Sequence, residues 1–136
     1  MSNAQNLAYA AVQVLHNFGA VAAVGGSLAA TRIKIVGDRK KLAWLALAGW
    51  GTQAASGAGF GLVSYYFYHQ LPDIAGIAVA ALMIKMLCAA TGLMLVAAYV
   101  LWGASWPERK GNAVLLSSVI LAAIALSSAA FLRWFS

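Results

Sequence analysis

The sequence has very little charge, and almost none of it is acidic. Only 9% of the 136 residues are charged, and Asp and Glu together number three. These carboxylates, Asp38, Asp73 and Glu108, fall between apolar stretches, so neither a Ser-His-Asp triad nor a carboxylate pair for hydrolysis can be built inside the apolar part. A single cysteine excludes an intrachain disulfide, and no CxxC metal pattern occurs.

Long apolar runs are what the sequence has instead. Hydrophobic residues make up 63% of the chain, and a membrane-crossing helix needs about 20 mostly apolar residues. Four such runs cover residues 7–30, 42–68, 74–102 and 113–135. They are continuous rather than alternating, which favours helices over the strands of a β-barrel. The sequence therefore predicts an all-α fold, a membrane-embedded four-helix bundle forming one domain over residues 1–136.

The basic residues predict the orientation of this bundle. The net charge is +6, and most Lys and Arg residues lie in the first and third connections, including Arg32, Lys34, Arg39 and Arg109. Basic connections face the cytoplasm, which places both termini outside. The charge excess is thus a signal of topology, and we expect the lipid bilayer, not nucleic acid, as the partner.

Two polar residues lie deep within the predicted spans. Lys85 is about 11 residues into the third span and His16 about 9 into the first, so at about 1.5 Å per residue both lie some 14–16 Å from the outer surface. A lysine near the bilayer centre costs roughly 2.5–3.5 kcal/mol on insertion scales, which makes it a candidate functional residue. We expect these two side chains at the same height in the bundle.

Helical periodicity predicts which side of each span packs inward. His16 and Lys85 each share a face with small residues. The second span has one similar seam, formed by Gly49, Gln53, Ser56, Gly57 and Ser64. The small residues expected in helix contacts are Gly19, Ala23, Gly26 and Ala30 in the first span and Ala54, Gly57, Ala58 and Gly61 in the second. The faces predict a polar pocket framed by His16, Gln53 and Lys85.

No carboxylate is available within the spans to neutralise Lys85. It either loses its proton, binds carbonyls, Gln53 or water, or pairs with an anionic ligand. A purely structural role, in which His16 and Lys85 tie helices together, is the alternative. The methionines of the third span, Met83, Met86 and Met94, fall on the side away from Lys85, where lipid or another subunit is expected.

One segment resembles known membrane families. The stretch LHNFGAVAAVGGSLAATR, residues 15–32, is similar to the first helix of small bacterial four-helix proteins that include HemJ-type protoporphyrinogen oxidases and CopD-type copper resistance domains. In these families a histidine precedes a glycine or glycine pair by nine and ten residues, and in HemJ-type proteins an arginine ends the helix. The matching residues here are His16, Gly25, Gly26 and Arg32, and Gly57 and Lys85 fit later positions of the pattern.

The resemblance implies a bacterial inner-membrane, multi-pass protein that binds haem b. It makes His16 the ligand to the metal and Lys85 the essential, catalytic residue near the porphyrin, where a lysine can pair with a carboxylate. Gln53 would be a pocket donor, and Arg32 joins the cofactor-binding set.

Three functions are compatible with the sequence. The first is haem-b-dependent electron transfer or tetrapyrrole oxidation, an oxidoreductase role within the bilayer. The second is an accessory subunit of a larger respiratory or oxidase complex, or a homodimer, without its own cofactor. The third is transport of copper or a small solute. For copper the chain offers soft ligands in Met and Cys88, but they form no His-Met or Cys-Met cluster.

Overall fold

Four long helices make up almost all of the structure. The computed structural model describes residues 2–135, which contain no strand. The helices are α1 (Asn3–Arg32), α2 (Val36–Tyr68), α3 (Ile77–Trp102) and α4 (Glu108–Phe135), with a short 3-10 turn η1 (Gly103–Ser105) after α3. The all-α prediction is therefore confirmed for this part of the chain.

The helices differ from the predicted runs mainly at the basic end. We expected Arg39 in a connection, but it lies in the first turns of α2, and the first connection contains only residues 33–35. Arg109 likewise lies in α4 rather than before it. Arginine and lysine are good helix formers, so these helices continue past the last apolar residue. At the other end α1 begins at Asn3, where the Ser2 side chain accepts a hydrogen bond from the Gln5 backbone N–H.

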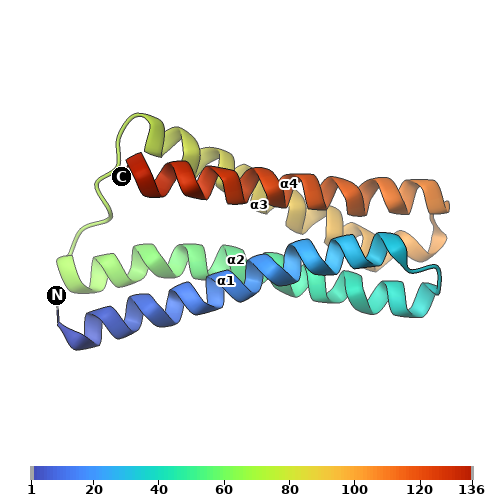
Figure 1. Cartoon of the computed structure of the whole chain (residues 1–136), viewed down its shortest axis with the longest axis horizontal. Coiled ribbons are helices and arrows are strands. Elements are labelled where there is room, and N and C mark those ends of the chain that lie inside the picture. The colour runs from blue at the N-terminus through green and yellow to red at the C-terminus, as the bar shows by residue number, and fades with distance from the viewer. Residues whose placement is uncertain (1, 136) are drawn as a thin grey trace.

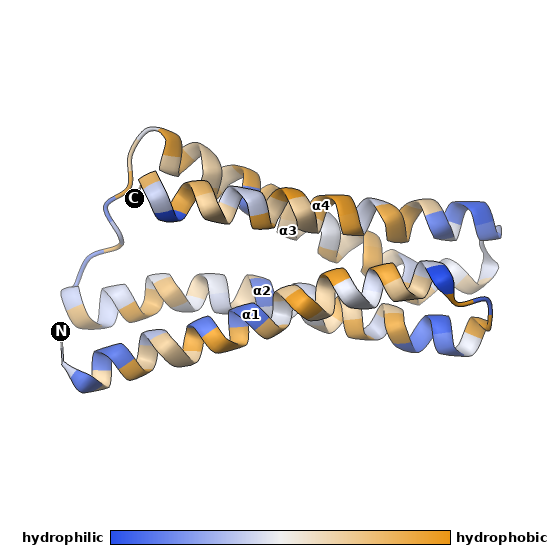
Figure 2. Cartoon of the chain, in the orientation of Figure 1, coloured by the Kyte–Doolittle hydropathy of each residue, from blue (hydrophilic) through white to orange (hydrophobic). Residues whose placement is uncertain are grey.

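The helices pair as two antiparallel hairpins, α1 with α2 and α3 with α4 (Figure 1). The hairpins lie side by side, with both termini at one end and the short connections that follow α1 and α3 at the other (Figure 1). Hydrophilic residues gather at the end with these connections and recur near the middle of α1 and α2 (Figure 2).

Glycines bring α1 and α2 into backbone contact. A Cβ built on Gly26 would lie 2.8 Å from the Ala46 backbone nitrogen, and one on Gly19 would lie 3.1 Å from the Gly49 carbonyl oxygen. The predicted face of α1 is thus confirmed. For α2 the expected packing residues Ala54, Gly57 and Ala58 are wrong, because they are exposed. The contact is made by Gly49, which belongs to the predicted polar seam with Gln53.

The core is built around one large side chain. Trp50 is 2% exposed, and it packs among small and aliphatic residues of the neighbouring helices, including Val96 and Leu115. Gly92 of α3 makes room for the Trp50 ring, since a Cβ there would collide with it. Most other large apolar side chains point outward.

Three helical segments are long and apolar enough to cross a membrane: Asn3–Arg32, Ile77–Ser105 and Glu108–Phe135. We expected four, but α2 is not among them, because it combines glycines with polar residues such as Gln53. The outward position of the large apolar side chains suits a lipid environment. The length and composition of these helices therefore indicate a membrane protein.

Candidate functional site

The candidate site forms around His16 in the middle of α1. His16 is 8% exposed and lies on the inward face of its helix, in line with Gly19 and Ala23. The edge of its ring meets the ring of Phe60 from α2, with centroids 5.6 Å apart. Small residues one and two turns later let α1 approach α2, and this approach holds the imidazole between helices rather than in lipid.

A chain of hydrogen bonds fixes the tautomer of His16. Its Nδ1 lies 2.7 Å from the Ser56 hydroxyl oxygen, and that hydroxyl donates its hydrogen to the Thr52 carbonyl oxygen of the preceding turn. A serine has one hydrogen to donate, so Nδ1–H must be the donor to Ser56. The lone pair of His16 is therefore on Nε2, the nitrogen that faces α3.

Lys85 of α3 occupies the position in front of this lone pair. Its Nζ lies 2.9 Å from His16 Nε2, although the two residues are 69 positions apart in the chain. Lysine has donors only, so the amine donates to the imidazole. The contact is consistent with the expectation that both residues lie at one height, and it joins one helical hairpin to the other.

Gln53 completes the contact from α2. Its side-chain amide donates a hydrogen bond to the His16 backbone carbonyl oxygen, which fixes α1 against α2 one turn from Ser56. The structure therefore brings together His16, Gln53 and Lys85, as the sequence predicts.

A cavity of about 130 Å³ opens beside these residues. It is bounded by all four helices, with a polar side and an alanine-rich side. The polar side chains are Gln13, His16, Asn17, Gln53 and Lys85, and the small ones are Ala20, Ala23, Ala122, Ala125 and Ala129. A narrow, partly polar space between the hairpins thus leads to the Lys85–His16 pair.

Arg32 does not belong to the site. It is exposed at the last position of α1, 16 residues from His16, which is about 24 Å along a helix. Met83, Met86 and Met94 are exposed on the outside of α3, as their helical phase predicts, and so they contribute no ligand to the cavity.

A second buried polar cluster lies beside the site, and no pattern in the sequence predicts it. The Trp50 indole N–H donates to the Ser118 hydroxyl at 2.9 Å, and the Ser27 and Ser118 hydroxyl oxygens are also 2.9 Å apart. These three side chains come from α2, α4 and α1, and all are buried. Their hydrogen bonds connect the two hairpins beside the cavity and hold Trp50 in the cavity wall.

The described residues 2–135 contain no group of three or more His, Cys, Asp or Glu side chains able to hold a metal ion. In this part of the chain His16 is the only histidine that lines the cavity, and its Nε2 lone pair accepts a hydrogen bond from Lys85. No protein-family model, curated protein or solved structure matches the chain. The similarity to HemJ-type and CopD-type proteins therefore stays a prediction.

Proposed function

We propose that all four helices cross the bilayer as a bundle with both termini outside. The case for α2 is its packing along α1, from the stacked rings of Tyr9 and Phe60 near one end to Gly26 and Ala46 near the other. A helix packed this way on a crossing helix crosses with it. α2 is less apolar than the other helices because some of its polar side chains, such as Gln53 and Ser56, point inward and bond to His16.

Sided labelling tests this topology. In a Cys88→Ala background, a cysteine at Lys34 should react with an impermeant maleimide only from the cytoplasmic side of an inner bacterial membrane. A cysteine at Leu71 should react only from the outside. Labelling of both positions from the same side would refute the four-crossing arrangement.

We further propose that the protein acts at the Lys85–His16 pair, where it binds an anionic, lipid-soluble molecule and exchanges a proton with it. One observation carries this proposal: the amine of Lys85 is held inside the helix assembly against an imidazole and not against a carboxylate. The three carboxylates of the chain, Asp38, Asp73 and Glu108, lie in or next to connections. An ammonium in such surroundings gains most from an anion supplied by a ligand.

The hydrogen-bond chain supports the proton exchange. Lys85, His16 and Ser56 form a continuous series of donors and acceptors. His16 can accept a proton from Lys85 at Nε2 while its Nδ1 proton passes to the Ser56 hydroxyl. The alanine-rich wall between α1 and α4 leaves a narrow space for an apolar chain. We place only the acidic group and the first carbons of a single-chain acid in this space, at Lys85, and the rest of the chain outside it in the lipid, because about 130 Å³ is too small for the whole molecule.

Haem b, which the sequence resemblance implies, suits the site in chemistry but not in size. His16 Nε2 is a suitable axial nitrogen, and Lys85 could pair with a propionate. The cavity of about 130 Å³ is, however, smaller than the roughly 300–1,000 Å³ of pockets for drug-sized ligands, and haem is larger than most of these. Haem therefore does not fit this arrangement of the hairpins.

Two measurements on the detergent-purified chain test the proposed function. The first is binding of palmitate against methyl palmitate, followed by tryptophan fluorescence because Trp50 lines the cavity. Palmitate should bind at least tenfold more tightly than the ester, and Lys85→Met should abolish the difference. Lys41→Met, which changes an exposed lysine paired with Asp38, is the matched control. Equal binding of acid and ester to the wild type would refute an anion site.

The second measurement is a reduced-minus-oxidised absorption spectrum after incubation with haem. The small volume of the cavity predicts no b-type band. A band that disappears in His16→Ala would show that the hairpins open for haem and would restore the oxidoreductase function. A colourless chain that binds no acid and co-purifies with membrane subunits would favour the accessory-subunit function.

A further inference from the structure

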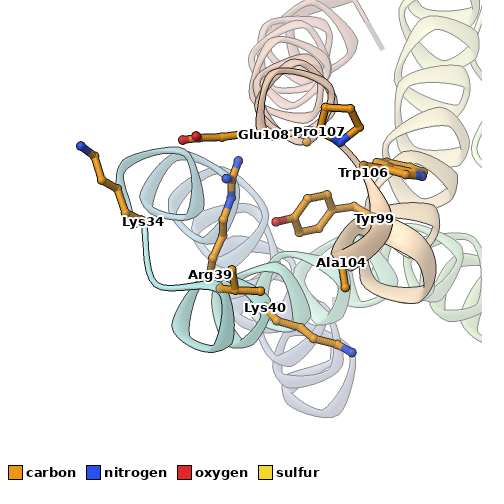
Figure 3. A pocket seen from close by; sticks show the side chains of 11 residues that line it. Lys34, Arg39, Lys40, Tyr99, Ala104, Trp106, Pro107 and Glu108 are labelled. Carbon is orange, nitrogen blue, oxygen red and sulfur yellow. The ribbon is translucent and has the colours of Figure 1, made fainter.

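A second cavity lies at the basic end of the molecule, far from the Lys85–His16 pair. Its volume is about 290 Å³, and it forms where the first turns of α2 meet the end of α3 and the start of α4 (Figure 3). The residues that line it include Lys34, Arg39, Lys40, Tyr99, Trp106 and Glu108. Three of these six are cationic, and one is acidic.

Arg39 is the unusual residue of this cavity. It is 7% exposed, although arginine is almost never fully buried unless it is paired. One Nη donates to the Asn112 side-chain oxygen, but the buried Nε–H has no hydrogen-bond partner among the described residues. Within residues 2–135, the only ion pair joins Lys41 and Asp38, so Arg39 has no carboxylate partner there.

Aromatic packing holds the guanidinium of Arg39 in place. Its central carbon lies 5.7 Å from the centre of the Tyr99 ring, within the range of a cation–π contact. Tyr99 itself is fixed, because a Cβ on Gly103 would lie 2.8 Å from its ring and one on Gly111 would lie 3.0 Å away. Figure 3 shows Arg39 reaching between Tyr99 and Glu108.

We propose that this cavity binds a phosphate group, either the headgroup of an anionic phospholipid or free phosphate. Phosphate supplies several oxygen acceptors and negative charge, which the fork-shaped guanidinium of Arg39 binds through paired hydrogen bonds. Lys34 and Lys40 line the same cavity and add positive charge. Basic pockets between membrane helices on the cytoplasmic side are known to take anionic headgroups. This site is independent of the one at Lys85.

Thermal unfolding of the delipidated chain, with native mass spectrometry to count bound molecules, tests the proposal. Phosphatidylglycerol should raise the melting temperature and bind one molecule tightly, whereas phosphatidylcholine should not. Inorganic phosphate, compared with chloride at equal ionic strength, separates the two sources. If it reproduces the shift, the ligand is free phosphate, and if only the lipid does, the ligand is a headgroup. Equal effects of both lipids with none from phosphate would overturn the proposal.

Variants locate the site. Arg39→Gln should weaken binding roughly ten- to a hundredfold, because hydrogen bonds to charged groups contribute that much to affinity. Lys40→Gln, which changes an exposed residue of the cavity rim, should weaken it less and keeps the test valid if Arg39→Gln does not fold. Arg32→Gln is the matched control, since Arg32 is exposed at the same end but does not line the cavity. Equal losses in Arg32→Gln and Lys40→Gln would show attraction to general surface charge and refute the site.

Discussion

Alanine at position 49 is expected to push α1 away from α2. The added Cβ would lie 2.8 Å from both the Ala22 carbonyl carbon and the Gly19 carbonyl oxygen, and closer still to the Ala23 backbone nitrogen. Carbon atoms in ordinary contact are about 3.5–4.0 Å apart. All three neighbours are backbone atoms, so no side chain can rotate away and the helices themselves must move.

The magnitude follows from the same geometry. Overpacking of a closely fitted contact costs typically about 1–3 kcal/mol, and we expect Gly49→Ala to lower the free energy of unfolding by that amount. The site should be affected too, because Gln53 lies one turn after Gly49 and binds the His16 carbonyl oxygen. Palmitate binding should therefore weaken together with stability.

The assay is SDS-induced unfolding in mixed micelles, followed by circular dichroism. Gly51→Ala is the matched control, since a Cβ there meets nothing within 4 Å. Glycine loses more backbone freedom than alanine when a helix folds. Gly51→Ala should therefore leave the free energy of unfolding unchanged or raise it by up to about 1 kcal/mol. If Gly49→Ala and Gly51→Ala unfold at the same SDS fraction, α1 and α2 do not pack as the structure describes.

Three further predictions use the same assay or a simple labelling reaction. Lys85→Met should raise the unfolding free energy by about 1–2 kcal/mol, because a lysine deep in the bilayer costs roughly 2.5–3.5 kcal/mol and the lost hydrogen bond to His16 offsets only part of this; a loss of stability would show that Lys85 and His16 chiefly tie helices together. Trp50→Phe should cost about 1–3 kcal/mol, since it removes the hydrogen bond to Ser118 and part of the buried ring; no change would exclude that bond as a link between the hairpins. Cys88 is 6% exposed, so maleimide should label it slowly in the folded chain and quickly in SDS, and fast labelling of the folded chain would contradict its position.

The meeting of His16 and Lys85 could be predicted because depth and helical phase follow directly from position in the sequence. The rise and rotation per residue place His16 and Lys85 at one height and on inward faces, and the structure puts their nitrogens 2.9 Å apart. The helix ends at the basic end of the molecule could not be predicted from depth and helical phase. Charge marks the limit of the apolar layer, whereas a helix continues as long as its residues, such as Arg39 and Lys40, are good helix formers.

The serines show why the rest of the interior could not be predicted. Ser117 and Ser127 bond to carbonyl oxygens of their own helix, whereas Ser118 accepts the Trp50 indole N–H and meets Ser27. A serine in a helix can do either, and composition does not say which. The choice depends on how α1, α2 and α4 cross, and this is set by glycine contacts such as Gly49 against Ala23 that have no counterpart in a single helix.

The two proposed sites share one electrostatic feature, a cation that contacts neutral groups of the protein. The chain has nine basic residues and three acidic ones, and Lys85 and Arg39 are the cations drawn furthest into the helix assembly. Each contacts neutral groups, an imidazole for Lys85 and an amide and an aromatic ring for Arg39. Neutral partners orient a cation without cancelling its charge, so each position remains favourable for an anion from outside the chain. The two anions should differ, because Lys85 faces an alanine-walled space of about 130 Å³ and Arg39 a basic one of about 290 Å³.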